Sequence, residues 1–390
     1  STGGDIQVNG VTQGSDSAGS ESLTLSAGTG EVTVGALYGA NLTGNASGLS
    51  TINIASAGAV LLDVVDIVGN LSVIADKTIT QRQSTLVSVD GLVNLTAEDV
   101  VLTQIAATGA VTVAAIDDVS LTSNADLLLN GSVGGDLVVS AEGVAISSTA
   151  LSTSGSSIYT ADSLSLIGLR AAGDIQLAVA DSATLVNDQA TTLKGTATTL
   201  SVTASSGAIT DSGDLTVQGL ASFTASGVGG GIVLNNAGNT FGSVSLASTP
   251  GTVLLVEADD TMLRNLTANT ASITSGGVIE DAAGAVLTVA GQSTLKAAGN
   301  ITLGDDPEGQ VQFGSVDVSG AEVTLTEQGG TLVDGILASA LVLNSSGAAI
   351  TNSATANVSV AGPVSIDAGS AAVTLGSDGG LFEAGRLNIA

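Results

Sequence analysis

The feature that most constrains this chain is a pattern of short strands separated by turn residues, clearest between residues 207 and 248. Apolar and polar residues alternate there in pieces of three to five residues, such as 215–217 and 232–234, and Gly, Asn, Asp and Ser lie between the pieces. An alternation of period two is typical of β-strands, and turn formers limit each strand to a few residues. No segment of this stretch keeps the helical period of about 3.6 residues. The pattern therefore predicts an all-β fold.

The same pattern returns along the chain, with a period of roughly 70 residues. Ile209, Ile279 and Ile350 mark equivalent positions at nearly equal intervals, and phenylalanines 241, 313 and 382 recur with almost the same spacing. Such an array buries its core between neighbouring repeats, so we expect a single continuous structure over residues 1–390 rather than separate domains. The approximate repeats are 1–78, 79–145, 146–208, 209–278, 279–349 and the partial repeat 350–390.

Strands occur roughly three times in every 20–25 residues, which is the length of one coil of a three-sided β-solenoid, so each repeat should contain about three coils. In a solenoid each strand pairs with its counterpart one coil along, about 4.8 Å away, and inward side chains form ladders. We therefore expect Leu215, Val217 and Phe223 to point inward and Thr216 to face water. A string of sandwich domains would need blocks of about 100 residues with aromatic cores, whereas aromatic residues make up 2% of this chain. The sequence predicts a parallel β-helix.

The composition narrows the classes of partner. Hydrophobic residues make up 44% of the chain, which is enough for a continuous core and argues against disorder. Seven basic and 36 acidic residues give a formal net charge of −29, which excludes nucleic acid and anionic membrane surfaces because both attract cationic proteins. No apolar run reaches the ~18 residues of a membrane span, so no membrane insertion is expected. The absence of cysteine suits a chain that is exported unfolded.

The side chains that catalysis needs are scarce. The chain has no His and no Cys, so it lacks the base of the usual nucleophilic triads. Ser293 and Lys296 have a Ser-x-x-Lys spacing, but in a strand these two positions point to opposite faces. The carboxylate groups at residues 257–260 and 305–308 are the densest candidates for glycoside cleavage. We interpret them as solvated turns and predict that the protein is not an enzyme.

Asp305, Asp306 and Glu308 are also the candidate metal ligands, because Ca²⁺ prefers hard oxygen ligands in turns. Neither an EF-hand loop nor a glycine-rich nonapeptide array accompanies them. Two interpretations of these carboxylates stay open, a calcium site and a solvated turn. Motifs for zinc and for a phosphate-binding loop are absent, so calcium is the one cofactor that the sequence suggests.

One run of residues resembles a known family. It comprises Ala208-Ile-Thr-Asp, Leu215-Thr-Val, Phe223-Thr-Ala, Ile232-Val-Leu-Asn-Asn and Asn239-Thr-Phe-Gly-Ser-Val-Ser-Leu. This run resembles the repeats of filamentous-haemagglutinin-like bacterial surface proteins, and the resemblance is strongest over residues 200–390. Members of that family are large exported adhesins that fold as right-handed parallel β-helices. The resemblance therefore implies this handedness and an extracellular location at the bacterial cell surface.

The residues and the resemblance together predict a structural, non-enzymatic shaft segment of an extracellular bacterial adhesin or surface fibre. Neither end of the sequence carries a recognisable cap, so the expected partners are further coils of the same chain or identical subunits stacked end to end. A host or neighbouring-cell surface, or a glycan, is a further expected partner. Two alternatives stay open: a subunit that polymerises end to end into an extracellular filament, and a carbohydrate-binding or carbohydrate-active β-helix.

Overall fold

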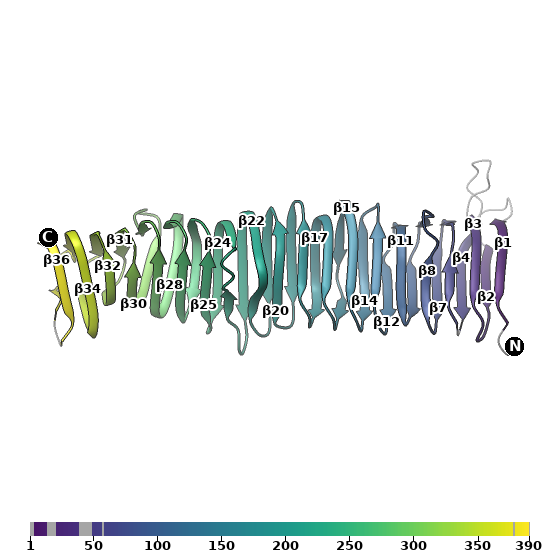
Figure 1. The fold of residues 1–390 in the computed structure, drawn as a ribbon, viewed down its shortest axis with the longest axis horizontal. Helices are drawn as coiled ribbons and strands as arrows, with labels where there is room; N and C mark the ends of the chain where they lie inside the picture. The colour runs from purple at the N-terminus through teal and green to yellow at the C-terminus, as the bar shows by residue number, and fades with distance from the viewer. Residues whose placement is uncertain (1–3, 14–20, 39–48, 57, 377–378, 390) are drawn as a thin grey trace. The chain divides into compact units, whose positions relative to one another are not determined.

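The structure, a computed structural model, describes residues 4–13, 21–38, 49–56, 58–376 and 379–389 (Figure 1). Every regular element in these ranges is a β-strand, and the strands pair in parallel, which confirms the predicted parallel β-helix. Contacts within the chain form two compact units, residues 1–188 and 189–390. Parts of the predicted repeats 1–78 and 350–390 lie outside the described ranges. The single continuous array over residues 1–390 stays a prediction.

The first unit contains strands β1 to β19, which are between 3 and 15 residues long in the described ranges. Their bounds are β1 (Ile6–Gln13), β2 (Glu21–Ser26), β3 (Val32–Tyr38), β4 (Leu49–Ser56), β5 (Val60–Leu62), β6 (Val65–Ile67), β7 (Asn70–Ala75), β8 (Thr78–Gln81), β9 (Val87–Val89), β10 (Val93–Ala97), β11 (Asp99–Ala107), β12 (Val111–Ala115), β13 (Val119–Ser123), β14 (Leu127–Val133), β15 (Leu137–Ser148), β16 (Leu151–Thr153), β17 (Ser157–Ala171), β18 (Ile175–Val179) and β19 (Ser182–Asn187).

The second unit contains strands β20 to β36, and Figure 1 shows them side by side in chain order. Their bounds are β20 (Thr191–Ala197), β21 (Thr199–Ala204), β22 (Ile209–Ser226), β23 (Ile232–Leu234), β24 (Thr240–Thr249), β25 (Thr252–Glu257), β26 (Thr261–Ala268), β27 (Thr270–Ser275), β28 (Ile279–Ala297), β29 (Ile301–Leu303), β30 (Gln310–Ser319), β31 (Glu322–Glu327), β32 (Thr331–Ala338), β33 (Ala340–Ser345), β34 (Ile350–Asp367), β35 (Val373–Thr374) and β36 (Leu381–Ile389).

Three strand segments make up one coil in each unit, as the strand spacing predicts. In the first unit, Val93 of β10 pairs with Val111 of β12. The chain between them is β11, whose two arms pair with different strands, β8 and β9. Paired residues lie further apart along the chain in parts of the second unit, as Val217 and Phe241 do. The coil from Val93 to Val111 is thus a little shorter than the expected coil of roughly 20–25 residues.

The marker isoleucines open the three longest strands of the second unit, β22, β28 and β34. Each of these strands bends through the corners of its coil instead of stopping at them. In β22, for example, the first arm pairs with β23 and the two following arms pair with β24. The repeat seen in the sequence therefore starts with one strand that runs around a whole coil.

The repeat is three coils and one further strand long, so successive repeats start on different faces. The ladder that contains Ile209 continues through Ile232, Val253 and Ala271, and then passes to Ser293. That ladder does not include Ile279, which pairs with Thr261 and Ile301 on the next face. The expected three coils per repeat are therefore present, and one strand is added to them. Because of the extra strand, a residue of one repeat and its equivalent in the next repeat lie on neighbouring faces of the coil.

The core of each unit is a set of aliphatic ladders, as the low aromatic content predicts. Leu215, Val217 and Phe223 are at most 2% exposed, and Thr216 between them faces water. The ring of Phe223 meets that of Phe241 edge to face, with centroids 5.8 Å apart. Each marker phenylalanine that lies in this core stacks on a valine of the coil before, as Phe241 does on Val217. The marker thus places an aromatic ring in a mainly aliphatic core.

The glycine after two of the marker phenylalanines lies against the backbone of the preceding coil. A Cβ atom at Gly242 would lie 2.0 Å from the carbonyl oxygen of Gln218, and one at Gly314 would lie 2.2 Å from that of Ala290. Real Cβ atoms do not approach a carbonyl oxygen this closely, so one of the two coils would have to move. The recurring Phe-Gly pair is therefore explained by the close approach of two coils.

We predict that Gly314→Ala lowers the free energy of unfolding by about 1–3 kcal/mol, because a methyl group must be forced between two packed strands. Gly213→Ala is the matched control, since its Cβ would be 3.4 Å from the Lys194 Cβ, an ordinary contact. Urea unfolding followed by circular dichroism measures both variants. An equal loss of stability in the two variants would contradict the close packing of the coils at Gly314.

Candidate functional site

The predicted calcium ligands lie on the loop between β29 and β30. Asp306 uses both carboxylate oxygens within the protein: Oδ2 accepts a hydrogen bond from the Gly284 N–H at 2.8 Å, and Oδ1 accepts one from the Glu308 N–H at 3.0 Å. The side chains of Asp305 and Glu308 are exposed. The structure therefore brings the three residues onto one loop, and Asp306 ties that loop to the preceding coil.

A fourth carboxylate, Asp281, belongs to the same region. Its Oδ1 accepts a hydrogen bond from the Gly304 N–H at 3.0 Å, and its Oδ2 is buried without a hydrogen-bond partner. Burial raises the pKa of Asp281, and the charges of Asp305 and Asp306 raise it further, while the bond from Gly304 acts in the opposite direction. Asp281 was missed by the sequence analysis because it lies on another coil.

A signal for Asp281 does exist in the sequence. Asp211, Asp281 and Asn352 each follow a marker isoleucine by two positions. One repeat before Asp281, the carboxylate of Asp211 accepts hydrogen bonds from the N–H groups of Asn235 and Asn236 and from Nδ2 of Asn239, at 3.0, 2.9 and 2.7 Å. In these two repeats the aspartate holds the corner of the next coil.

The calcium site stays a prediction from the sequence. Within the ranges that the structure describes, no group of three or more His, Cys, Asp or Glu side chains is arranged to hold a metal ion. Both oxygens of Asp306 already accept backbone hydrogen bonds. Calcium binding would therefore have to compete with the contacts that hold the loop.

A polar groove of about 470 Å³ crosses the outward faces of β28, β30, β32 and β34. Its charged and amide side chains are Lys296, Asp317, Asp334 and Asn357. Oδ2 of Asp334 accepts hydrogen bonds from Ser315 Oγ at 2.6 Å and from Gln292 Nε2 at 3.0 Å. The groove thus presents donors and acceptors side by side, the arrangement that a polar ligand such as a sugar requires.

The polar groups of this groove are not shared with the preceding repeat. Aligned on the Phe-Gly-Ser-Val marker, Asp317 corresponds to Ser245. Asp334 and Arg264 correspond through the strand pairing, because each is the residue left without a partner at the register shift of its strand. Arg264 also contacts the serine of the marker: its Nε donates a hydrogen bond to Ser243 Oγ at 3.2 Å, as Ser315 Oγ donates one to Asp334. Both repeats thus have a charged side chain bonded to the marker serine, but this side chain is basic in one repeat and acidic in the next.

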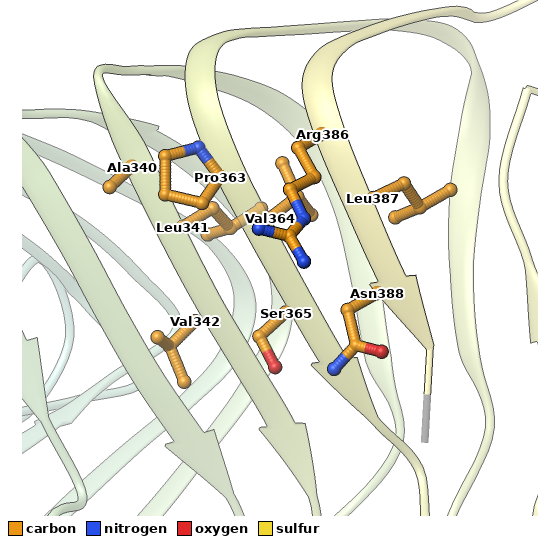
Figure 2. A pocket seen from close by; sticks show the side chains of 9 residues that line it. All are labelled: Ala340, Leu341, Val342, Pro363, Val364, Ser365, Arg386, Leu387 and Asn388. Atoms are coloured by element: carbon orange, nitrogen blue, oxygen red, sulfur yellow. The ribbon is translucent and has the colours of Figure 1, made fainter.

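A second groove, of about 430 Å³, lies across β33, β34 and β36. Figure 2 shows its lining side chains on these three neighbouring strands. Arg386 is the one charged residue in the lining, and Ala340, Val342 and Pro363 are among its apolar residues. Because Arg386 is one of only seven basic residues in a chain of net charge −29, this groove differs in charge from the outer surface in general.

Two glutamates are buried, and one of them corrects the sequence analysis. Glu257, interpreted there as part of a solvated turn, is 2% exposed, and Glu327 is 1% exposed. Both end a strand that alternates inward and outward, and the last inward position falls on the glutamate. Asp259 and Asp260, in the turn that follows Glu257, are exposed as expected. The alternation itself was the signal for Glu257.

The buried carboxyls make one strong hydrogen bond each. Oε1 of Glu257 accepts from the Phe241 N–H at 3.0 Å, and Oε1 of Glu327 accepts from the Phe313 N–H at 2.8 Å. Burial raises the pKa of both glutamates from 4.5 to about 7, against hydrogen bonding from Phe241 and Phe313 and from the threonine four positions on. The Oε2 atoms and these threonine hydroxyls have no partner in good hydrogen-bond geometry.

The Ser-x-x-Lys string has the geometry that a strand dictates. Ser293 is fully buried in β28, and Lys296 is exposed on the opposite face. The two side chains therefore do not meet, and the expectation from the sequence is confirmed. The described residues also contain no helix long and apolar enough to cross a bilayer.

The fold and these sites define a β-solenoid repeat protein. Residues 180–248, 250–307 and 309–385 match the family described as repeats of unknown function (DUF5649). Since these matches cover just over half of the chain, the protein belongs to this family. Comparison with curated proteins and with solved structures gave no match. A repeat β-helix protein is thus confirmed, and the closer resemblance to filamentous-haemagglutinin-like adhesins enters below only as a proposal.

The calcium prediction is checked by titration calorimetry of the full chain with CaCl₂. If Asp305, Asp306 and Glu308 bind the ion, the expected result is a saturable heat that disappears in the Asp305→Asn, Glu308→Gln double variant, which leaves the loop contacts of Asp306 in place. The exposed Glu322→Gln substitution on β31 is the control and should leave the heat unchanged. The absence of binding heat at millimolar calcium would contradict the prediction.

Proposed function

We propose that the chain is a structural, non-enzymatic shaft segment of an extracellular bacterial adhesin or surface fibre. The observation that supports this most is the continuous stacking of strands in the second unit. One ladder of the second unit pairs in parallel at every step from Thr261 through Ile279, Ile301, Val323, Leu341 and Val364 to Leu387. Every coil along such a ladder is bonded to the coil before it and to the coil after it.

This stacking suits a mechanical role. Detaching one coil breaks the hydrogen bonds of three strand segments together and exposes the aliphatic ladder, so local opening is costly. The backbone in the strands is inaccessible to proteases while those bonds persist. The proposal therefore assigns the chain the work of a stiff, resistant spacer, and any adhesive tip would be formed by other residues.

The extracellular location in this proposal comes from the resemblance and is supported by composition. The chain has no cysteine, and charged residues make up only 11% of it. The net charge of −29 makes parallel copies repel each other, which keeps shafts apart. The proposed partners are further coils of the same chain or identical subunits stacked end to end, and the surface or glycan met by the complete fibre.

Electron microscopy of the native material, combined with the intact mass of its denatured chain, tests this proposal. A shaft segment predicts a polypeptide several times longer than 390 residues, with the repeats in a thin extension. The end-to-end filament predicts long fibres built from chains of about this length. A compact, unextended particle would contradict both hypotheses.

The carbohydrate-binding alternative is favoured by one observation, the polar groove that contains Asp317 and Asp334. It predicts that the full chain binds an oligosaccharide on a glycan array, and that Asp334→Asn abolishes the signal while Glu322→Gln, outside the groove lining, does not. The shaft proposal predicts no specific signal from the wild-type chain. Binding that survives Asp334→Asn would place the ligand elsewhere and reject this groove.

A further inference from the structure

Three buried polar side chains occupy one position of the repeat. Asn187, Glu257 and Glu327 are each one repeat apart, and each ends a strand with its side chain pointing inward. All three are at most 2% exposed. Each is followed four positions later by a buried threonine, at 191, 261 and 331. The position is therefore polar in three successive repeats although it lies inside an aliphatic core.

The three side chains do the same work in the ladder. The Oδ1 atom of Asn187 accepts a hydrogen bond from the Ala171 N–H at 3.1 Å, as the Oε1 atoms of Glu257 and Glu327 accept from Phe241 and Phe313. At this position the backbone N–H donates to a side-chain oxygen, where in the rest of the ladder it would donate to a backbone carbonyl of the next coil. A buried N–H without a partner costs about 1–3 kcal/mol, so the acceptor is needed.

The side-chain amide of Asn187 also donates a hydrogen bond. Its Nδ2 donates to the Ala171 carbonyl oxygen at 3.2 Å, so the side chain both accepts from and donates to one residue. A neutral carboxylic acid has the same pair of groups, one acceptor oxygen and one O–H donor, whereas a carboxylate has two acceptors and no donor. The second oxygen of each glutamate is buried and accepts no hydrogen bond in good geometry, although the hydroxyl of the threonine four positions on lies close enough to lower the pKa of the carboxyl.

From this equivalence we propose that Glu257 and Glu327 are held as neutral carboxylic acids inside the folded second unit and make its stability depend on pH near neutrality. A proton on Oε2 supplies the donor that Nδ2 supplies in Asn187. Loss of that proton leaves a buried charge with one N–H and one poorly aligned threonine hydroxyl beside it, and these do not offset the free-energy cost of its burial. The corner is then loosened at both glutamates.

The charged groups near the two glutamates either raise the pKa of the carboxyl or point away from it into solvent. Asp259 and Asp260, in the turn after β25, oppose ionisation of Glu257. Arg264 on the adjoining β26 points outward to Ser243. No charged group shifts Glu327, since its pKa depends on burial and on hydrogen bonding alone. Around Glu327, the carboxylates on β30, β31 and β32 (Asp317, Glu322 and Asp334) lie at outward positions of their strands.

The sign of the effect follows from the raised pKa values. Below pH 4.5 the glutamates are protonated in the folded and in the unfolded chain, and the stabilisation is fully present. Between 4.5 and about 7 the folded chain keeps protons that the unfolded chain has lost, so stability falls as the pH rises. Each glutamate should raise the unfolding equilibrium constant by up to about tenfold per pH unit in this window.

The test compares the urea midpoint of the full chain at constant ionic strength between pH 5 and pH 8. The wild-type midpoint is expected to fall as the pH rises. The Glu257→Gln, Glu327→Gln double variant is expected to lose most of this slope, because glutamine is neutral at every pH, whereas Asp281, whose pKa is also raised, stays in both chains. The Glu280→Gln, Glu322→Gln variant removes two outward carboxylates of the same unit and should keep the slope. An unchanged slope in the Glu257→Gln, Glu327→Gln variant would overturn the proposal.

A second measurement does not require the variants to fold. Wild-type chain labelled with ¹³C at the glutamate carboxyl is titrated by NMR, which reports each carboxyl separately. Two resonances with midpoints near 7 are expected, one from Glu257 and one from Glu327. If all resonances of the folded chain titrate near the ordinary value, Glu257 and Glu327 are not held as neutral acids.

Discussion

The parallel hydrogen bonds between successive coils are the constraint on which the rest of the structure depends. Because strands of neighbouring coils lie about 4.8 Å apart, the side chain at one position must stack directly on that of the next coil. Phe241, for example, stacks on Val217 of the coil before, and the glycine that follows it lies against the backbone of that coil. Sequence variation is therefore limited by the neighbouring coil and much less by the neighbours in the chain.

The corners are where this ladder is hardest to complete, and polar side chains complete it. The carboxylate of Asp211 bonds three donors of the next corner, and Asp281 bonds one. Glu257 and Glu327 reach back to the coil before and accept a backbone hydrogen bond in the core. Asp211, Asp281, Glu257 and Glu327 thus hold the backbone of neighbouring coils at the corners.

The extra strand in each repeat also affects what the surface can do. Since a repeat is three coils and one strand long, equivalent residues of successive repeats lie on different faces of the coil. The repeat therefore does not build a row of identical groups along one face, as a repetitive binding surface would need. The polar groove at Asp317 and Asp334 depends instead on residues that differ between repeats. This distribution agrees with a repeat whose task is to maintain the stack.

The sequence by itself determined the strands, their inward and outward faces and the period of the repeat, because alternation and turn residues are local signals. Leu215, Val217 and Phe223 could be placed in the core for this reason, and Ser293 and Lys296 on opposite faces. Only the tertiary structure decided that the Phe241 N–H donates to Glu257, that Asp281 meets the loop at Asp306, and that successive repeats start on different faces. These facts depend on which residues lie one coil apart. That offset is smaller between Val93 and Val111 than between Val217 and Phe241. It changes with the shape of each corner, and no local pattern encodes it.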